Sequence, residues 1–266
     1  MASGLKQRII TAIAIGIPIL ALLFYSTETR IVLIALLMFF TAIEYLKLSY
    51  DNSKKWLPAI SLLATIGLIY LVKIDSIAIY FLGASLIFNL YLLIELYFLK
   101  GTSLTKNAWI NSLFYTSIPL SLLIMEKNID RIDILFPSIL LMIWISDISA
   151  YFVGKSIGKR KLMLRISPGK SWEGFWGAGL VTILSSYIFF TIFNIYNVQV
   201  WALIGLSVWL FGSIGDLVES KFKRALGIKD SGTILPGHGG FLDRFDGFYF
   251  CIPFVLTVVF IADHFL

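Results

Sequence analysis

The chain has 266 residues, of which 58% are hydrophobic and only 14% are charged, and its mean hydropathy is +0.87. Soluble domains are nearer half apolar and a quarter charged, so the composition excludes an ordinary soluble domain and predicts an all-α, polytopic integral membrane protein. The net charge of +6 does not indicate nucleic-acid binding, because the basic residues lie in short connections between apolar segments. A single cysteine, Cys251, excludes an intrachain disulfide.

Nine apolar segments are candidate transmembrane helices, since a helix needs about 20 apolar residues to cross a bilayer. In chain order they are residues 9–25, 31–48, 57–73, 76–99, 108–125, 132–153, 174–194, 199–218 and 247–264. The first follows Lys6 and Arg8 and resembles a signal peptide, but no small-residue cleavage site closes it, so we expect a retained helix. The shortest expected turn lies around Lys73 and Asp75.

The distribution of Lys and Arg predicts the orientation of these helices. If the N-terminus lies in the cytoplasm, 18 of the 22 Lys and Arg residues fall on the cytoplasmic side. With nine helices the C-terminus then lies outside. Both long polar loops, residues 154–173 and 219–246, face the cytoplasm in this arrangement, where nucleotides are available.

Two carboxylates, Glu44 and Glu95, lie within apolar segments of the first half. An acid inside the membrane is a functional candidate by default. Both lie near expected cytoplasmic helix ends, however, which favours a hydrogen-bonded or snorkelling side chain. Pro119 is expected to kink the fifth helix.

The sixth segment and the loop after it carry a series of polar residues. Asp147 lies just inside the expected cytoplasmic end, and Tyr151 and Lys155 follow on the same helical face. The loop adds Lys159, Arg160, Lys161 and Arg165. For the first three, a role in setting topology is the favoured interpretation. Residues 167–171 are expected to lead into the N-terminus of the seventh helix, with Glu173 at its start, a position that suits a phosphate.

Gly169-Lys170-Ser171 resembles the end of a P-loop, which also requires a glycine five residues earlier. Leu164 occupies that position and no strand is expected before it, so we reject a P-loop. Lys170 remains a candidate phosphate ligand because its ammonium group is a strong donor to phosphate oxygens.

The eighth segment ends in a polar helical face made of Asp216, Glu219, Ser220 and Lys223. Asp216 lies just inside the expected cytoplasmic end, as Asp147 does on the sixth segment. Gly212 and Gly215 on the same segment predict close packing against another helix.

The ends of segments six and eight and the start of segment nine are expected at one membrane level on one side. A charge at membrane depth is costly unless a cation neutralises it. Clustered carboxylates suit a hard divalent cation such as Mg²⁺. The candidate metal ligands are Asp246, Asp216, Asp147, Glu219 and Asp243. Structural ion pairs with nearby Lys and Arg are the alternative interpretation.

The longest polar run of the chain, residues 220–246, reads SKFKRALGIKDSGTILPGHGGFLDRFD. Its glycines allow the backbone to approach a ligand closely. Its candidate phosphate contacts are Lys223, Arg224, Lys229 and Arg244. His238 lies between Gly237 and Gly239, where a role beside a phosphate or a base edge is expected rather than one in a core.

The ordered pattern S-x-x-K-R-x4-K-D-x-G-x3-P-G-H-G-G-x-x-D-R-x-D in this run resembles the signature of the phosphatidate cytidylyltransferases, or CDP-diacylglycerol synthases. The resemblance extends over roughly residues 144–250. It includes Asp147 with Tyr151 and Gly154, then Ser167-Pro168 with Lys170, Ser171, Glu173 and Gly174, and then Gly215-Asp216 with Glu219-Ser220.

The resemblance implies a nucleotidyltransferase that converts CTP and phosphatidate into CDP-diacylglycerol and pyrophosphate early in phospholipid synthesis. It also implies Mg²⁺, with a second metal ion or a monovalent cation as a further option, and a homodimer in the cell inner membrane. Residues 1–131 would form an N-terminal scaffold or dimerisation region of about five helices. Residues 132–266 would form the catalytic region of about four.

The family pattern assigns roles to three groups of residues. The catalytic group is Asp246, Asp243, Lys223, Arg224, Lys229, Arg244 and His238. The substrate-binding group is Ser167, Lys170, Ser171, Glu173, Tyr151, Ser220, Gly237, Gly239 and Gly240. The metal-binding group is the set of five carboxylates named above.

Two alternatives stay open. A CTP-dependent lipid kinase or another lipid phosphotransferase would use the same types of residue. A secondary transporter of an anionic metabolite would also explain acids within membrane helices. A transporter is disfavoured because the charges gather at one face and the two halves of the chain look unlike each other.

Overall fold

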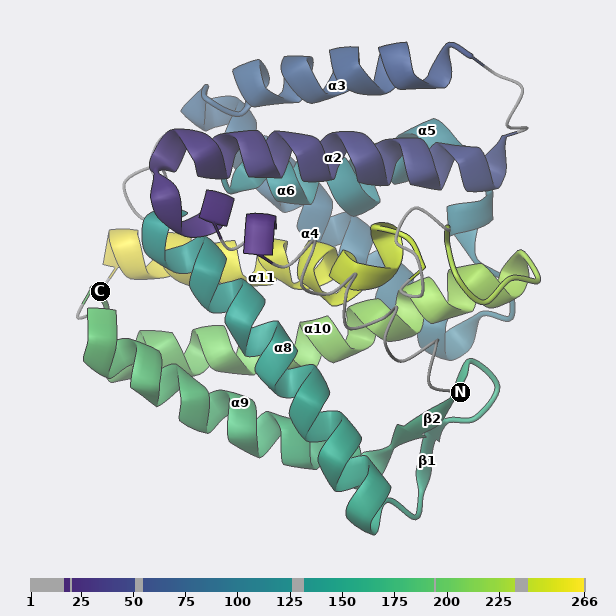
Figure 1. Cartoon of the computed structure of the whole chain (residues 1–266), viewed down its shortest axis with the longest axis vertical. Helices are drawn as coiled ribbons and strands as arrows, with labels where there is room; N and C mark the ends of the chain where they lie inside the picture. Colours follow the sequence, from purple (N-terminus) through teal and green to yellow (C-terminus); the bar gives the residue numbers. More distant parts are fainter. Residues whose placement is uncertain are drawn as a thin grey trace.

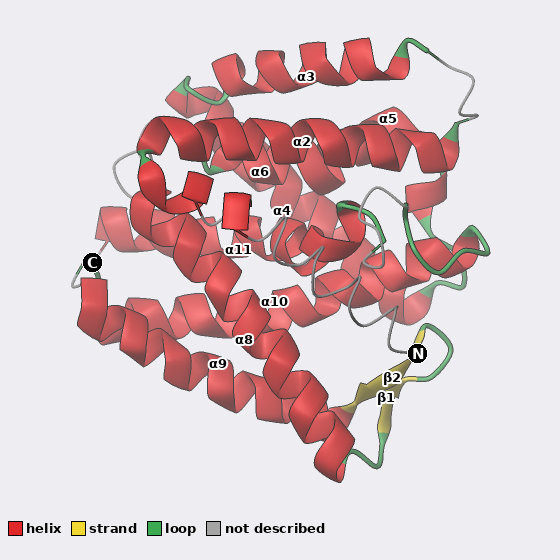
Figure 2. Ribbon diagram, viewed as in Figure 1, coloured by secondary structure: helices red, strands yellow, loops and turns green. Residues whose placement is uncertain are grey.

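The computed structural model describes residues 17–19, 21–50, 55–125, 132–193, 195–232 and 239–265. Nearly all of these residues lie in helices (Figures 1 and 2). The long helices are α2 (Thr27–Ser49), α4 (Asp75–Phe98), α8 (Ile132–Ile157), α9 (Trp172–Phe193), α10 (Val198–Ala225) and α11 (Leu242–Phe265). In the described part of the chain, these six helices have the length and apolar composition needed to cross a membrane. The expectation of an all-α polytopic membrane protein is therefore confirmed at the level of fold class.

The other predicted segments appear as shorter elements. The third is α3 (Leu57–Leu71), and the turn that separates it from α4 is as short as expected. The fifth is a broken helix made of α5 (Ala108–Ser112), the π-helical turn η2 (Leu113–Ser117) and α6 (Ile118–Leu122). The π turn comes directly before Pro119, as expected where proline removes a backbone donor. Most of the first segment, 9–25, lies outside the described residues.

The polar loop after α8 is a β-hairpin, which corrects the expectation that no strand lies before Gly169. Strands β1 (Lys161–Met163) and β2 (Ser167–Ser171) pair in antiparallel fashion, so the fold is not purely helical. Residues 167–171 form strand β2 and lead directly into α9, which begins at Trp172 with Glu173 in its first turn, as expected. The hairpin lies at one end of the molecule, where it packs against α8 and α9 (Figure 2).

Helices α8 to α11 form the most tightly connected group, in which α8 packs on α9, and α10 packs on α9 and α11. Glycines allow α10 and α11 to approach closely, as predicted for Gly212 and Gly215. A Cβ on Gly215 would lie 2.6 Å from the Cβ of Phe250, and one on Gly247 would lie 2.9 Å from the carbonyl of Gly212. This close approach sets the spacing between the helices that carry Asp216 and Asp246.

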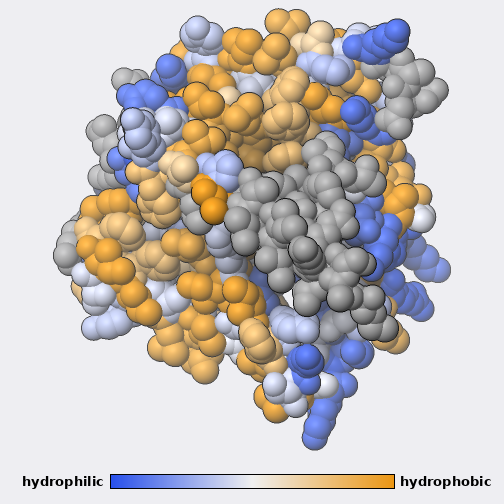
Figure 3. Space-filling model, viewed as in Figure 1, coloured by the Kyte–Doolittle hydropathy of each residue, from blue (hydrophilic) through white to orange (hydrophobic). Residues whose placement is uncertain are grey.

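The N-terminal helices also contact this group, since α4 and α6 pack on α11 and α4 packs on α10. Tyr45 of α2 stacks on Phe222 of α10, with ring centroids 5.0 Å apart. The surface in Figure 3 is largely hydrophobic over α8 and α9, and hydrophilic residues gather at the end where the hairpin lies. The end of the bundle at the hairpin is thus polar, and the face over α8 and α9 is apolar.

Candidate functional site

The polar end of the bundle collects the chain segments that carry the candidate residues. In Figure 1 the C-terminal ends of α8 and α10, the start of α11 and the hairpin all lie toward the right side of the molecule. Asp147 of α8, Asp216 of α10 and Asp246 of α11 lie within electrostatic range of one another. The structure therefore brings together three acids that are far apart in the sequence.

Lys170 and Asp216 form an ion pair between β2 and α10, with Nζ and Oδ2 2.5 Å apart. Asp216 also accepts a hydrogen bond from the hydroxyl of Ser220, at 3.2 Å. Both side chains of the pair are partly accessible, with exposed fractions of 27% and 33%. Burial lowers the pKa of Lys170, but the adjacent Asp216 carboxylate outweighs burial and leaves this pKa above its ordinary value. Lys170 is therefore a cation at neutral pH.

Lys223 is held between two carboxylates. Its Nζ lies 2.9 Å from Oε2 of Glu219 and 2.6 Å from Oδ1 of Asp243. Glu219 is fully buried, and its other oxygen, Oε1, has no hydrogen-bond partner among the described residues. Glu219 also lies beside Asp246. A buried carboxylate oxygen without a donor is costly, so this position suits a proton or a cation.

Asp243 fastens the loop between α10 and α11. Its Oδ2 accepts hydrogen bonds from the backbone N–H of Ser231 at 2.8 Å and of Gly240 at 2.9 Å. Gly239 has a positive φ of 85°, and a Cβ there would lie 2.6 Å from Oδ2 of Asp243. Both oxygens of Asp243 are thus occupied, which favours a structural role for this carboxylate over a metal ligand.

The other cations of the polar run lie at the surface. Arg224 is exposed, and it donates to the carbonyls of Ile166, at 3.4 Å, and Ile228, at 3.0 Å, so it links the hairpin to the loop after α10. Lys229 and Arg244 are exposed and available to a ligand. His238 and Gly237 lie outside the described residues.

The residues around the start of α9 shape the hairpin. Ser171 accepts a hydrogen bond from the N–H of Gly174 at 3.1 Å and caps α9. The carboxylate of Glu173 accepts from the N–H groups of Lys159, at 3.0 Å, and Arg160, at 3.2 Å. Ser171 and Glu173 thereby position Lys170, which lies directly before them.

The remaining predicted substrate-binding residues lie around the same end of the molecule. Tyr151 is exposed on α8, and the ammonium group of Lys155 lies 5.7 Å from its ring centroid. Ser167 is half-buried in β2, opposite Met163. Gly240 is buried within the loop between α10 and α11.

The fit of this site to a metal ion rests on the chemistry of its donors. Among the described residues, no group of three acidic, histidine or cysteine side chains is arranged as a ready metal site. The unpartnered oxygen of Glu219 beside Asp246 is nevertheless the kind of donor that a hard cation takes. The donors at this position are therefore of the chemical type that suits a hard cation such as Mg²⁺.

Sequence reasoning singled out Glu44 and Glu95 but did not foresee their partners. Glu95 accepts hydrogen bonds from the backbone and hydroxyl of Ser103, at 2.8 and 3.0 Å, so the hydrogen-bonded interpretation is confirmed there. Glu44 accepts from the N–H of Phe241 at 2.7 Å and contacts the hydroxyl of Ser231. Only its position inside an apolar segment marked it in the sequence.

The polar run, residues 220–246, also contains a lysine with a structural role. Lys221 is buried, and its ammonium group donates to the carbonyls of Glu95, at 2.5 Å, and Leu99, at 2.7 Å. These carbonyls belong to the C-terminal end of α4, where a lysine satisfies free acceptors and complements the helix dipole. Lys221 therefore has a structural role, unlike the other cations of the polar run.

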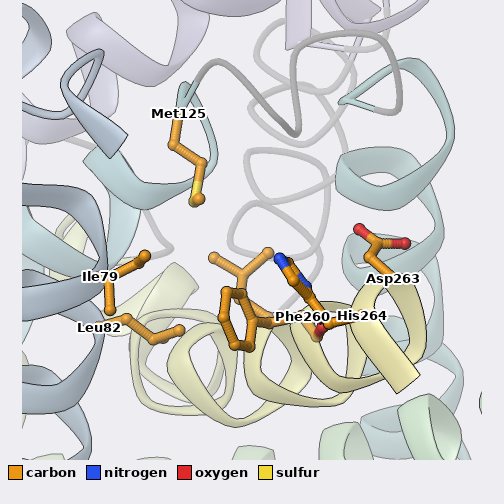
Figure 4. Close-up of a pocket in the computed structure, with 7 residues that line it drawn as sticks. Ile79, Leu82, Met125, Phe260, Asp263 and His264 are labelled. Atoms are coloured by element: carbon orange, nitrogen blue, oxygen red, sulfur yellow. Dashed lines mark hydrogen bonds between the residues drawn. The ribbon is translucent and has the colours of Figure 1, made fainter. Parts of the chain in front are cut away.

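A small pocket lies at the opposite end of α11, lined by Ile79, Leu82, Met125, Leu256, Phe260, Asp263 and His264. Its lining is mostly apolar. Figure 4 shows Asp263 on the far side of Phe260 and His264 from Ile79 and Leu82. This pocket is separated by the length of α11 from the acidic cluster formed by Asp147, Asp216, Glu219 and Asp246, and it has no converging carboxylates among the described residues.

Comparison with known proteins adds independent information. The sequence model described as the "Cytidylyltransferase family" matches residues 6–262. A protein of Staphylococcus aureus (strain COL) named phosphatidate cytidylyltransferase is 52% identical over 115 residues, which cover 42% of this chain and 44% of that protein. A protein of the same name from Bacillus subtilis (strain 168) is 50% identical over 115 residues, or 43% of each chain. The aligned part is thus less than half the length of these relatives.

Proposed function

Because the chain belongs to the cytidylyltransferase family, we propose that it transfers the cytidylyl group of CTP to phosphatidate and forms CDP-diacylglycerol and pyrophosphate. The observation that carries this proposal is the joint arrangement of Lys170, Asp216, Lys223, Glu219 and Asp246 at one end of the bundle. Cations beside acids are what a reaction between two phosphorylated molecules requires. The relatives named phosphatidate cytidylyltransferase supply the identity of the lipid.

The chemistry needs positioning more than a strong base. A phosphate oxygen of phosphatidate is already a nucleophile and attacks the α-phosphorus of CTP. The new bond joins that oxygen to the α-phosphorus, while the bond to the bridging oxygen breaks and pyrophosphate leaves with its electron pair. The two reactants repel each other, so Lys170, Lys223 and the exposed Arg244 reduce the repulsion and orient the phosphate oxygens.

We propose Mg²⁺ as the cofactor, held by Asp216 and Asp246 with Asp147 or Glu219. The cation would offset the charge of the nucleotide phosphates and of the leaving pyrophosphate. Asp243 is a weaker candidate ligand because Lys223 and the loop amides already use its oxygens. Chelation of divalent cations should stop the reaction, and the addition of Mg²⁺ should restore it. Full activity in chelator would refute the magnesium proposal.

We also propose that the reaction takes place on the cytoplasmic side of the cell inner membrane, in a homodimer with nine spans per chain. The excess of Lys and Arg in the connections at the polar end of the bundle supports this orientation. A site at the ends of membrane helices can meet CTP from water and a lipid headgroup from the side.

Labelled CTP separates this function from that of a lipid kinase. Purified protein is incubated with phosphatidate vesicles and with CTP labelled at either the α- or the γ-phosphate. We expect the α-label to enter the lipid and the γ-label to leave as pyrophosphate. Transfer of the γ-label to lipid would indicate a kinase. Uptake of an anion into proteoliposomes without any lipid product would indicate a transporter.

A further inference from the structure

Glu44 lies on α2, in the half of the chain that carries none of the predicted site residues. Its side chain is buried and faces the loop between α10 and α11. One carboxylate oxygen contacts the hydroxyl of Ser231, and the other accepts the N–H of Phe241 at 2.7 Å. Glu44 thus contacts both described flanks of the loop, which are 187 and 197 residues away in the sequence.

The glycines of this loop pack directly on the Glu44 carboxylate. A Cβ on Gly240 would overlap this carboxylate and also lie close to the hydroxyl of Ser231. A Cβ on Gly232 would lie 3.1 Å from Cδ of Glu44. The absence of side chains at these two positions is therefore what lets the loop reach the acid on α2.

Hydrogen bonds continue from Glu44 to the acidic cluster. The hydroxyl of Ser231 lies 2.9 Å from Oδ2 of Asp243, whose Oδ1 lies 2.6 Å from Lys223. Lys223 in turn lies 2.9 Å from Oε2 of Glu219, which is beside Asp246. A buried polar chain therefore runs from α2 through the loop to α10 and α11.

We infer that Glu44 is a positioning residue for the reaction of the proposed site: it fixes the loop so that Ser231 and Asp243 hold Lys223 and Glu219 in place. This inference rests on the proposed function for its kinetic consequences. Its structural part, the hold of Glu44 on Ser231 and Phe241, does not depend on the identity of the substrate.

The hydrogen-bond count indicates which substitution Glu44 tolerates. A hydroxyl carries one hydrogen, so Ser231 can donate to only one of the two carboxylates that it contacts. Both oxygens of Asp243 already accept from N–H groups, as an ionised carboxylate does, so Ser231 donates to Asp243 and the contact with Glu44 needs a donor on the side of Glu44. In Glu44→Gln the amide N–H can donate to Ser231 while the amide oxygen still accepts from Phe241. Glutamine should therefore preserve the arrangement, whereas alanine removes both contacts.

The kinetic test compares Glu44→Gln and Glu44→Ala with the purified wild-type protein. Misplacement of a reacting group by about 1 Å can cost roughly 100-fold in rate, so we expect a loss of that order in kcat for Glu44→Ala and a kcat near wild type for Glu44→Gln. KM for CTP should change much less than kcat. Wild-type kcat and KM in Glu44→Ala would overturn the inference, as would an equal loss in both variants.

Two further variants separate positioning from loss of folding. Glu95→Ala removes another buried acid of the same half whose hydrogen bonds serve a different turn, so it should lower stability without lowering kcat of the folded fraction. Ser231→Ala removes the link to Asp243 from the loop side, and it should lower kcat as Glu44→Ala does. A loss of kcat in Glu95→Ala equal to that in Glu44→Ala would indicate a general folding defect and overturn the inference.

Amide hydrogen exchange tests the hold of Glu44 without any substrate. Exchange at Ser231 and Phe241 should accelerate in Glu44→Ala and stay near wild type in Glu44→Gln. Unchanged exchange in Glu44→Ala would show that Glu44 does not fix the loop. A wild-type protein that makes no lipid product would refute the proposed function instead, so the two failures are distinguishable.

Discussion

Lys170 and Asp216 are the pair that joins the hairpin to the helices. Lys170 is positioned by β2, which ends at the cap of α9, and Asp216 by the last turns of α10. Each is partly accessible, so a phosphate could replace or share this partner. Because the pKa of Lys170 is raised, the contribution of its charge to stability is fully present at neutral pH and is lost as the pH rises through the raised value. The ion pair also requires Asp216 to be ionised, so it is lost in strong acid as well.

Replacement of Lys170 tests its role as a phosphate cation. Loss of one preorganised electrostatic contact typically costs about 100-fold or more in turnover, and we expect a loss of that size for Lys170→Gln. Lys170→Arg keeps the charge and should retain more activity. Because Lys170 is charged throughout the neutral range, a moderate change of pH should not rescue the glutamine variant. Steady-state rates from mildly acidic to mildly alkaline pH provide the measurement. Wild-type turnover in Lys170→Gln would remove Lys170 from the site.

Asp246 is the acid whose charge matters most in the proposed mechanism. In Asp246→Asn the amide oxygen can still accept from the N–H of Gly247, which is 2.7 Å from Oδ1 in the native protein, so the helix start should remain intact. We expect turnover to be abolished while the thermal unfolding profile is retained. Asp133→Asn is the matched control, because Asp133 pairs with Arg30 at the other end of the bundle. Near-normal activity of Asp246→Asn would exclude Asp246 as an essential metal ligand.

At the scale of elements, the interface of α10 and α11 sets the geometry of the acids. Gly215 lies one residue before Asp216, and a Cβ there would meet Phe250 at 2.6 Å and the carbonyl of Asp246 at 2.9 Å. The two helices can therefore carry acids at close range only because their backbones touch. The position of the site is a consequence of this contact.

Gly215→Ala tests that consequence. An extra methyl group in a closely packed interface should destabilise the protein by about 1–3 kcal/mol and separate the two helices. Gly83→Ala is the control, because that helical glycine has no atom within 4 Å of its added Cβ. Thermal unfolding in detergent should distinguish the two variants. Equal unfolding temperatures for both variants would mean that the interface of α10 and α11 accommodates the extra methyl group without loss of stability.

Elements with strong local signals could be predicted from the sequence. The apolar segments predicted the long helices, and the polar residues Lys73 and Asp75 predicted the turn before α4. The glycines of α10 predicted its close contact with a neighbouring helix, which is α11. The hairpin was missed because its strands are short. It is held by distant contacts instead, such as those of Glu173 with the backbone of residues 159–160.

The sequence predicts which residues form the candidate site, but it does not predict which of them contact one another. The helical spacing of Asp216, Glu219 and Lys223 placed them on one face, and topology placed Asp246 nearby. No local pattern indicates that Lys221 caps α4 or that Glu44 contacts Ser231, because the partners lie more than a hundred residues apart. Such pairings depend on the three-dimensional packing of both halves.

At the scale of the whole molecule, the two halves share the polar end of the bundle. Glu44 of α2 contacts the loop before α11, and Lys221 of α10 caps α4. Tyr115 of η2 lies within electrostatic range of Glu219 and Asp246. The N-terminal helices therefore form one wall of the candidate site, a role added to the scaffold or dimerisation role expected for residues 1–131.

The orientation of the molecule in the membrane can be tested by cysteine labelling. The native Cys251 is buried and can be replaced in a Cys251→Ser background. Lys161→Cys in the hairpin and Gln199→Cys at the start of α10 then report on opposite ends of the bundle, since both native side chains are exposed. We expect a membrane-impermeant maleimide to label position 161 only from the cytoplasmic face and position 199 only from the other face. The reverse pattern would invert the proposed topology. Labelling of both from one face would contradict the transmembrane arrangement of α9, because this helix connects the two positions.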